Sequence, residues 1–480
     1  MPPYLPPPLP RLLLVLAIGS TPALGQNLPP EVEAALQRAK VPREAVSMLV
    51  VDAEGKSVAR LSHRAGVAMN PASVMKLVTT YAALDLLGPA YTWSTPVYIE
   101  GAVRDGTLYG NLTIKGLGDP KLVLERVWLL LRRVQGLGVR SISGDIVLDH
   151  SAFAVAESDP GGFDGEPLRP YNVAPDALLL NYKSVVMTFV PDRTANTAQV
   201  QFDPPLAGVA MQATVPLAAG DCGDYRGALR ADFSDPTRIR FAGAYPASCQ
   251  EKVWPVAYAD PRSYSVRAID GLWQEMGGKL AGTVRDGRLP VPPAGPPPGP
   301  VFELVSPALA EVIRDINKYS NNVMAQQLFL TLALPPRGGN GAAASLDGAR
   351  ETVRRWWQER IGGTELPVLD NGSGLSRNER ISAQALARLL QTAYLSPQMP
   401  ELMSSLPITG VDGTMRRNRS RAAGNAHLKT GSLRDVAAFA GYVHAASGRR
   451  YVLVGIINHA NANAARPALD ALLDWTVRDN

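Results

Sequence analysis

Apolar residues recur three and four positions apart along several stretches of the chain, and the clearest of these runs from Leu77 to Leu87. This spacing places them on one face of a helix and predicts a buried helix there. The same periodicity predicts helices over residues 31–39, 125–134, 307–318, 323–332, 346–360, 382–394 and 466–477. Short alternating or continuous apolar runs predict strands over residues 47–51, 57–61, 97–99, 112–115, 146–148, 185–189, 200–202, 427–430, 436–443 and 451–457.

The order of these elements suggests how the chain is divided. Strands near both ends flank a helical set that resumes after residue 300, which predicts one α/β domain built from both ends of the chain. From about residue 95 to 296, short strands and glycine-rich turns dominate, with one or two helices. This middle block predicts one or two inserted β-rich modules, followed by a proline-rich loop or linker over residues 290–300.

The residues just before the Leu77 helix carry candidate chemistry. Asn70 and Pro71 form a start signal, a polar cap followed by proline in the first turn. Ser73 and Lys76 then lie one helical turn apart on the same face, so the lysine can take the serine proton. A lone S-x-x-K pattern has only two fixed letters and is usually a helix cap beside a solvated lysine. Partners elsewhere in the chain must therefore decide between the two interpretations.

The first residues resemble an export signal. Arg11 is followed by the apolar run 12–18 and then by the small residues Ala23 and Gly25. We predict a signal peptide over residues 1–25, cleaved near Gln26, and hence a periplasmic protein. The apolar run is too short to span a bilayer, so membrane association is expected to be peripheral at most.

Composition excludes some classes of function. The net charge of +5 is spread along 480 residues without a basic run or an aromatic-basic motif, so nucleic acid is not an expected partner. The chain has two cysteines, Cys222 and Cys249, and an exported pair predicts a disulfide. Its five histidines are scattered and form no HExxH motif, so we predict neither a metal site nor any other cofactor.

Two later motifs change the interpretation of Ser73 and Lys76. Ser320-Asn321-Asn322 lies just before a predicted helix, and Lys429-Thr430-Gly431 lies on a predicted strand. The set S-x-x-K, S-x-N and K-T-G, in this order, is the signature of serine penicillin-binding proteins and β-lactamases. Ser376-Arg377-Asn378 also fits S-x-N, but it lies in a loop, so we favour Ser320 and Asn322.

Spacing and further motifs bring the resemblance closer. The second motif follows Ser73 by 320 − 73 = 247 residues, and the segments 116–120, 143–149, 371–377 and 410–415 also match. Nearly the whole mature chain resembles class C, low-molecular-mass penicillin-binding proteins of the penicillin-binding protein 4 (DacB) type, peptidase family S13. The resemblance implies a transpeptidase-like α/β (α+β) fold, with helices packed on an antiparallel sheet and two β-rich domains inserted between the first and second motifs. It places the catalytic domain at 26–96 and 300–480, domain II at 97–185 and 262–299, and domain III at 186–261.

The resemblance also implies an activity, that of a D-alanyl-D-alanine carboxypeptidase and endopeptidase acting on peptidoglycan peptides and acylated by β-lactams. Ser73 would be the nucleophile and Lys76 its base, which requires the lysine pKa to fall from ~10.4 toward neutrality. Burial and a charged Lys429 nearby would lower it. Ser320 would relay a proton to the leaving amine, and Asn322 would orient Lys76 or the substrate amide.

The remaining groups would bind the substrate. Lys429 and Thr430 would hold its terminal carboxylate, and the backbone N–H groups of Ser73 and Ser432 would hold the oxyanion. Gly431 would leave room for the substrate strand. Four residues are candidates for contact with a stem-peptide side chain, namely Arg377, Arg434, Glu166 and Tyr171.

Two alternatives stay open from the sequence. A β-lactamase shares the motifs but must release the penicilloyl group quickly, and a non-catalytic peptidoglycan-binding or β-lactam-sensing module would share the fold alone. The balance of carboxypeptidase and endopeptidase activity, the role of the inserted domains and the oligomeric state are not encoded in these motifs.

Overall fold

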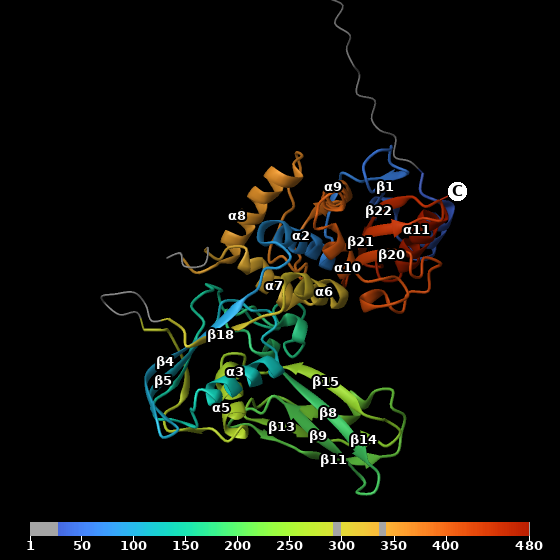
Figure 1. The fold of residues 1–480 in the computed structure, drawn as a ribbon. Coiled ribbons are helices and arrows are strands. Elements are labelled where there is room, and N and C mark those ends of the chain that lie inside the picture. The colour runs from blue at the N-terminus through green and yellow to red at the C-terminus, as the bar shows by residue number, and fades with distance from the viewer. Residues whose placement is uncertain (1–26, 291–298, 336–341, 480) are drawn as a thin grey trace, which may run out of the picture.

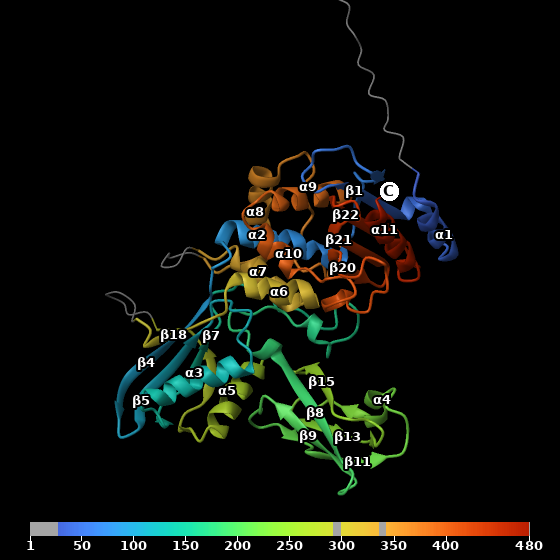
Figure 2. The same ribbon diagram turned by 45° about the vertical axis from the view of Figure 1, so that its right-hand side comes forward.

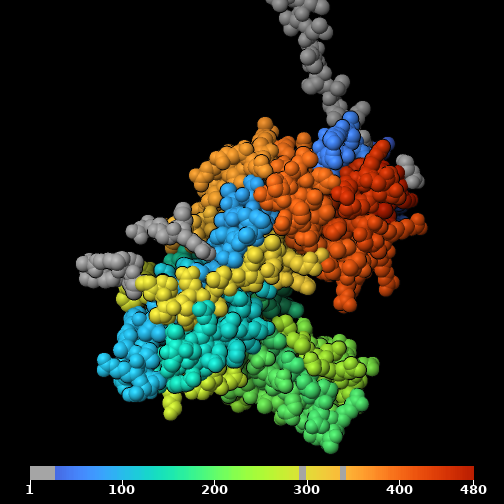
Figure 3. Space-filling model, viewed as in Figure 1, coloured from blue at the N-terminus to red at the C-terminus, as the bar shows by residue number. Residues whose placement is uncertain are grey.

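The computed structural model describes residues 27–290, 299–335 and 342–479. The chain forms two lobes, and both views separate them clearly (Figures 1 and 2). The terminal lobe holds residues up to about 93 and from about 306, drawn blue and yellow to red, and the inserted lobe holds residues 94–305. In the space-filling view the N-terminal and C-terminal segments lie together in the terminal lobe (Figure 3). The predicted signal peptide and residues 291–298 of the predicted linker lie outside the described residues.

A five-stranded antiparallel sheet in the order β2, β1, β22, β21, β20 forms the centre of the terminal lobe. Its strands are β1 (Val46–Asp52), β2 (Leu61–His63), β20 (Ala426–Leu433), β21 (Val436–His444) and β22 (Arg450–Asn458). Along its whole length β1 pairs with β22, from Val46 opposite Ile457 to Asp52 opposite Tyr451. Strands from both ends of the chain thus pair in one sheet, and β20 is left as its edge strand.

Helices cover both faces of this sheet. On one face α1 (Pro30–Arg38) packs beside α11 (Arg466–Arg478), against inward residues of β21 such as Ala437 and Phe439. The opposite face, which includes Ala438 and Ala440, carries the larger helical set. That set comprises α2 (Lys76–Leu87), α6 (Leu309–Tyr319), α7 (Asn322–Thr331), α8 (Leu346–Trp356), α9 (Ala383–Tyr394) and α10 (Met399–Ser405).

Helix α2 is central to that set, because its side chains are buried from Lys76 through Leu84. A helix that is apolar all round belongs in a core rather than at a surface. The sequence between Leu77 and Leu87 is of this kind, which explains the position of the helix. A charged group on α2 must therefore find its partners inside the protein, and Lys76 is such a group.

The inserted lobe contains three sheets. The largest consists of β4 (Ser94–Arg104), β5 (Thr107–Lys115), β6 (Ser141–Ile142), β7 (Ile146–Asp149), β16 (Lys279–Leu280), β17 (Val284–Gly287) and β18 (Phe302–Val305). The second consists of β8 (Ser184–Asp192), β9 (Thr197–Asp203), β11 (Thr214–Ala218), β14 (Tyr245–Pro246) and β15 (Lys252–Ala257). The third consists of β10 (Ala210–Met211), β12 (Ala231–Asp232) and β13 (Arg238–Phe241). Buried apolar residues from these sheets form one cluster, so the sheets pack against one another.

Short elements complete the fold. The strands β3 (Ala68–Met69) and β19 (Ile381–Ser382) pair with each other. The 3₁₀ helices are η1 (Arg43–Ala45), η2 (Ala72–Met75), η3 (Pro170–Asn172), η4 (Asn181–Lys183) and η6 (Gly413–Met415), and η5 (Trp357–Ile361) is a π-helical turn that continues α8.

Two sequence predictions differ from the structure. The strand predicted over residues 57–61 is wrong, since β2 begins at Leu61 and Val58 is 89% exposed to solvent. Between residues 95 and 290 the structure describes three α-helices instead of one or two, namely α3 (Leu124–Gly136), α4 (Tyr225–Leu229) and α5 (Tyr264–Glu275). The buried residues Ala268, Ile269 and Leu272 give α5 its helical periodicity, so the signal was present in the sequence.

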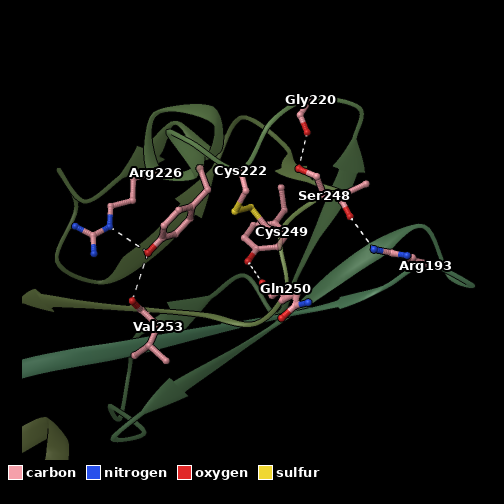
Figure 4. Close-up of a disulfide and its surroundings, with 11 residues drawn as sticks. Arg193, Gly220, Cys222, Arg226, Ser248, Cys249, Gln250 and Val253 are labelled. Atoms are coloured by element: carbon pink, nitrogen blue, oxygen red, sulfur yellow. Dashed lines mark hydrogen bonds between the residues drawn. A yellow bond between two sulfur atoms is a disulfide. The ribbon is translucent and has the colours of Figure 1, made fainter.

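The predicted disulfide between Cys222 and Cys249 is present (Figure 4). It closes a loop of 27 residues between β11 and β15, and Cys249 is buried in the apolar cluster of the inserted lobe. Beside it, the Ser248 hydroxyl donates to the Gly220 carbonyl at 2.7 Å. In the chain-entropy model, closing a loop of this length stabilises the folded state by about 3 to 4 kcal/mol. The closed segment carries the short elements α4, β12, β13 and β14.

The predicted domain boundaries remain a proposal that strand pairing supports. β8 and β15, near residues 184 and 257, belong to one sheet, and α5 follows β15 and packs on α3. Because β18 pairs with β4, we propose that the inserted part extends to Val305. Within residues 27–290, 299–335 and 342–479, no helix is both long enough and apolar enough to cross a membrane.

Candidate active site

Ser73 lies in the 3₁₀ helix η2, which leads directly into α2. Asn70 accepts the Ala72 N–H through its Oδ1 at 2.8 Å, as the start signal predicted. The α-helix nevertheless begins at Lys76 and not at Pro71, since Ala72 adopts a φ of +48°, a left-handed conformation that interrupts helical geometry. This turn holds the Ser73 hydroxyl at the base of α2.

Lys76 has no exposed surface, and its Nζ reaches three oxygen atoms. It lies 2.9 Å from Ser73 Oγ, 2.6 Å from Asn322 Oδ1 and 2.5 Å from the Ser373 carbonyl oxygen. Burial and the nearby Lys429 lower the pKa of Lys76 well below its usual value, and the Glu379 carboxyl opposes part of that change. The lysine can therefore be neutral and accept a proton from the serine in contact with it.

Lys429, on edge strand β20, is equally buried. Its Nζ donates to Ser320 Oγ at 2.9 Å and to the Thr430 carbonyl at 2.7 Å. Burial lowers the pKa of Lys429 to about 7. The sequence predicted a permanently charged Lys429, whereas this pKa means that its charge at neutral pH depends on what binds beside it.

Ser320 links α6 to α7 in an uncommon backbone conformation. Its φ of +57° is left-handed, which few residues other than glycine adopt, and which helps to turn the chain between the helices. Asn321 caps α7 by accepting the Met324 N–H, and Asn322 becomes the first residue of that helix. The turn thus directs Ser320 to Lys429 and Asn322 to Lys76.

Gly431 is required for a different reason from the one predicted. A Cβ at this position would lie 2.3 Å from the Pro71 carbonyl oxygen and 3.2 Å from the Ser73 nitrogen. The glycine therefore allows β20 to approach η2, which carries the nucleophile, rather than only making room for a substrate strand. Gly374 acts likewise on the other side, because its Cβ would lie 2.1 Å from the Ala72 carbonyl oxygen.

The competing motif has a structural role. Ser376 is 2% exposed and donates to Asp370 Oδ2 at 2.6 Å, and its oxygen accepts the Asn378 N–H at 3.0 Å. Ser376 thus stabilises the loop 370–378. The same loop contributes the Ser373 carbonyl that accepts from Lys76, and because this contact uses the backbone, no side-chain pattern could have indicated it.

The residues expected near the substrate side chain are spread along the rim of the site. Arg377 pairs with Asp435 at 3.0 Å and lies over the Phe163 ring at 4.7 Å, so it bridges the terminal and inserted lobes. Arg434 is exposed, and Glu166 pairs with Arg169. The Tyr171 carbonyl accepts from Asn322 Nδ2 at 3.2 Å, so the inserted lobe forms one wall of the site.

A hollow of about 640 Å³ opens above these groups. Ser73, Ser320, Thr430, Gly431 and Ser432 line it. Sequence reasoning missed Thr414, whose Oγ1 lies 2.7 Å from Thr430 Oγ1, and Arg466, which donates to Ser432 Oγ. Both residues lie outside β20 in the sequence, and the fold brings them next to it. No cluster of three metal-ligating side chains occurs in the described part of the chain.

A buried lysine in contact with a serine at a helix base, and a second buried lysine on an edge strand in contact with another serine, form the arrangement expected of a serine acyl transferase. Together with helices packed on an antiparallel sheet, this is the penicillin-binding protein and β-lactamase class of fold. Residues 28–478 match the D-Ala-D-Ala carboxypeptidase 3 (S13) family, and the chain belongs to it. It is accordingly a serine peptidase, as the sequence predicted.

Individual relatives agree with this assignment. The chain is 26% identical to a D-alanyl-D-alanine carboxypeptidase of Actinomadura sp. (strain R39), over 95% of this chain and 86% of the relative. It is 24% identical to the D-alanyl-D-alanine carboxypeptidase DacB of Haemophilus influenzae, over 81% and 80%. The crystal structure of penicillin binding protein 4 from H. influenzae matches the fold with a TM-score of 0.70 at 22% identity, covering 92% and 99%. A predatory peptidoglycan endopeptidase from Bdellovibrio bacteriovorus matches with a TM-score of 0.53 at 16% identity, covering 90% and 92%.

Proposed function

We propose that the chain acts on peptidoglycan stem peptides through an acyl-enzyme on Ser73, with neutral Lys76 as the base. The observation that carries this proposal is the contact of 2.9 Å between Lys76 Nζ and Ser73 Oγ, made by a lysine with no exposed surface. Desolvation favours the neutral amine, and a neutral amine in hydrogen-bond contact activates a hydroxyl.

Acylation then proceeds in balanced steps. Ser73 Oγ attacks the carbonyl carbon of the penultimate D-alanine, and its proton passes to Lys76 Nζ as the new C–O bond forms. Backbone N–H groups of Ser73 and Ser432 hold the oxyanion. When the C–N bond breaks, the Ser320 hydroxyl gives its proton to the leaving amine and takes a proton in turn from protonated Lys429, whose Nζ lies 2.9 Å away. Water later hydrolyses the ester by the reverse proton transfers and frees Ser73.

The other polar groups bind and orient. Lys429 and Thr430 hold the terminal carboxylate, and that negative charge favours the protonated form of Lys429. Asn322 fixes Lys76 through the contact of 2.6 Å and can present its amide to the substrate. Arg377 and Arg434, on the rim, are proposed contacts for an acidic stem-peptide side chain. To make this contact, Arg377 would have to leave its ion pair with Asp435, or bind Asp435 and the substrate together.

The location follows from the substrate. Peptidoglycan lies outside the cytoplasm, so we propose an exported, periplasmic protein that binds peptidoglycan peptides and β-lactams. The pattern of residues 11–25 supports export, and peripheral contact with the membrane is the most that this proposal includes.

Benzylpenicillin tests the proposal directly. The wild-type protein is expected to gain the mass of one penicilloyl group, and Ser73→Ala is expected to gain none, because Ser73 Oγ forms the ester bond. Intact-protein mass spectrometry measures both. Equal adducts on the two proteins, or none on the wild type, would overturn the proposal. A wild-type adduct that disappears within seconds would instead support a β-lactamase, and an adduct without D-Ala release from a pentapeptide would support a sensing module.

A further inference from the structure

The hollow above Ser73 continues into a basic wall that the proposed reaction does not use. Arg417, Arg419 and Arg466 line it along with Ser73 and Thr430. Among the described residues that line this hollow, the one acidic side chain is Asp470, which already accepts from Asn418 at 2.7 Å. The wall therefore carries excess positive charge.

The loop 415–421 that carries two of these arginines is anchored. Besides the contact to Asp470, Asn418 donates its N–H to the Met415 carbonyl at 3.0 Å. The Arg421 N–H donates to Asp474 Oδ1 at 2.8 Å, so the middle and the C-terminal end of the loop are fixed on α11. Arg417 and Arg419 flank Asn418, and both are exposed. Neither forms an ion pair or hydrogen bond with any residue that the structure describes.

The position of the loop indicates which part of a substrate it meets. Thr414, just before the loop, lies 2.7 Å from Thr430, the proposed carboxylate ligand. The arginines therefore lie past the substrate's terminal carboxylate, on the side of the leaving group. The volume of about 640 Å³ is in the range of sites that enclose whole ligands, and one alanine would fill a small part of it.

We propose that Arg417 and Arg419 bind the second stem peptide of a cross-linked substrate, so that the chain is built to cleave cross-links. This inference rests on the proposed function. The leaving group of a cross-linked dimer is a whole stem peptide with carboxylates of its own, and arginine binds carboxylates through paired N–H donors. A released D-alanine has no such extension.

The experiment compares D-Ala release from a monomeric pentapeptide with cleavage of a cross-linked dimer. In Arg417→Gln/Arg419→Gln, the ratio of kcat/KM for the dimer to that for the monomer should fall about tenfold, as expected for the loss of two exposed charge contacts. Arg416→Gln is the matched control, an exposed neighbouring arginine that does not line the hollow. An unchanged ratio in the double variant would overturn the subsite. Failure of the wild type on both substrates would overturn the proposed function instead.

A second, independent observation concerns Glu379, which is fully buried. Its Oε1 accepts the N–H groups of Asp370, Asn371 and Gly372 at 3.2, 3.2 and 3.0 Å. Its Oε2 has no hydrogen-bond partner among the described residues. A buried carboxyl with an unpartnered oxygen is costly, so it calls for a role.

Its contacts lead to the proposed base. The loop that Glu379 holds continues into Ser373, whose carbonyl accepts from Lys76 at 2.5 Å. Thr79 of α2 donates to the Gly372 carbonyl at 2.6 Å, which fixes the same loop against the helix of Lys76. The loop therefore transmits the position of the carboxyl to the lysine.

The charges around Glu379 are few. Glu379 interacts electrostatically with Lys76 of α2 and raises its pKa, whereas Lys429 of β20 lowers the pKa of Lys76. Asp370, on its own loop, is a like charge and is paired with Arg350 at 3.3 Å. Burial, with a smaller contribution from Asp370, raises the pKa of Glu379 to about 7, against the effect of the three N–H donors.

We infer that Glu379 is a positioning residue that orients Lys76 through the loop 370–373 and supplies its counter-charge. Two buried lysines share this site with one buried carboxyl. Removing the negative charge of Glu379 while keeping the loop in place should lower the pKa of Lys76. Lys76 would then stay neutral in more acidic solution.

Two variants separate charge from shape. Glu379→Gln keeps an acceptor for the loop N–H groups, and the acid limb of its penicillin acylation rate should move to lower pH. The shift should be smaller than about one pH unit, because the Glu379 carboxyl is itself partly protonated near its pKa of about 7. Glu379→Leu removes the acceptor as well and should slow acylation at every pH. The readout is the rate of adduct formation between pH 4 and 8. An acid limb that stays in place in Glu379→Gln would overturn the inference, while a wild type that forms no adduct would overturn the proposed function.

Discussion

Replacing Lys76 with methionine is expected to slow acylation of Ser73 by benzylpenicillin about 10³- to 10⁴-fold, the upper range for loss of a general base. Lys76 is the residue whose side chain contacts Ser73 Oγ, at 2.9 Å. The rate of adduct formation, followed by intact-protein mass, measures the effect. A loss of less than tenfold would contradict the role of Lys76 as base.

The same substitution should also raise the melting temperature. Methionine fills a similar buried volume and removes an amine whose burial is unfavourable, and this gain is expected to exceed the loss of the hydrogen bonds to Asn322 Oδ1 and the Ser373 carbonyl. Lys318→Met is the matched control, because Lys318 is 3% exposed but is paired with Asp412 at 2.6 Å. Loss of that pair leaves a carboxylate without its cation and should lower the melting temperature. Opposite shifts in the two variants, measured by thermal unfolding, would show that Lys76 is retained for chemistry rather than for stability.

Replacing Lys429 with methionine is expected to lower kcat/KM for peptides with a free terminal carboxylate by about 10²- to 10³-fold, as truncating a buried charge pair does. The pH profile gives the sharper test. Because burial lowers the pKa of Lys429 to about 7, the free enzyme loses this cation as the pH rises through 7. Wild-type kcat/KM should therefore fall on the alkaline side, and this limb should be absent from Lys429→Met.

The acid side of the Lys429→Met profile should move as well. The charge of Lys429 lowers the pKa of Lys76, so removing it should raise that pKa and shift the acid limb to higher pH. Glu379→Gln is expected to shift the same limb in the opposite direction. Steady-state kinetics between pH 5 and 9 measure these limbs. Shifts of the same sign in the two variants would contradict the electrostatic coupling of Lys76, Lys429 and Glu379.

Much of the fold could be predicted from local patterns. The helices α2, α6, α7, α9 and α11 and the strands β20, β21 and β22 begin and end within a few residues of the predicted positions. Their apolar spacing is a property of neighbouring residues, so it needs no tertiary information. The prediction failed at residues 57–61, where Val58 fits the alternation of a strand but is exposed to solvent. A strand forms only where it finds a pairing partner, and the local sequence does not specify that partner.

The motif residues could be predicted too, but not their physical states. The motifs assign different roles to Lys76 and Lys429. Only packing lowers the pKa of both lysines, and it brings that of Lys429 to about 7. Glu379, Ser373 and Thr414 escaped prediction because they act through a buried carboxyl, a backbone carbonyl and a contact between η6 and β20. No spacing rule encodes such contacts.

The sequence by itself determined the order of the apolar segments and the types of side chain offered to the site, since both depend on local periodicity and side-chain chemistry. The tertiary structure alone decided that η2 is held between Gly431 and Gly374, that Ser320 contacts Lys429, and that the charge of a buried carboxyl acts on the pKa of Lys76. The physical reason is that desolvation and Coulomb interactions depend on distance in space. Segments that lie hundreds of residues apart in the chain set those distances.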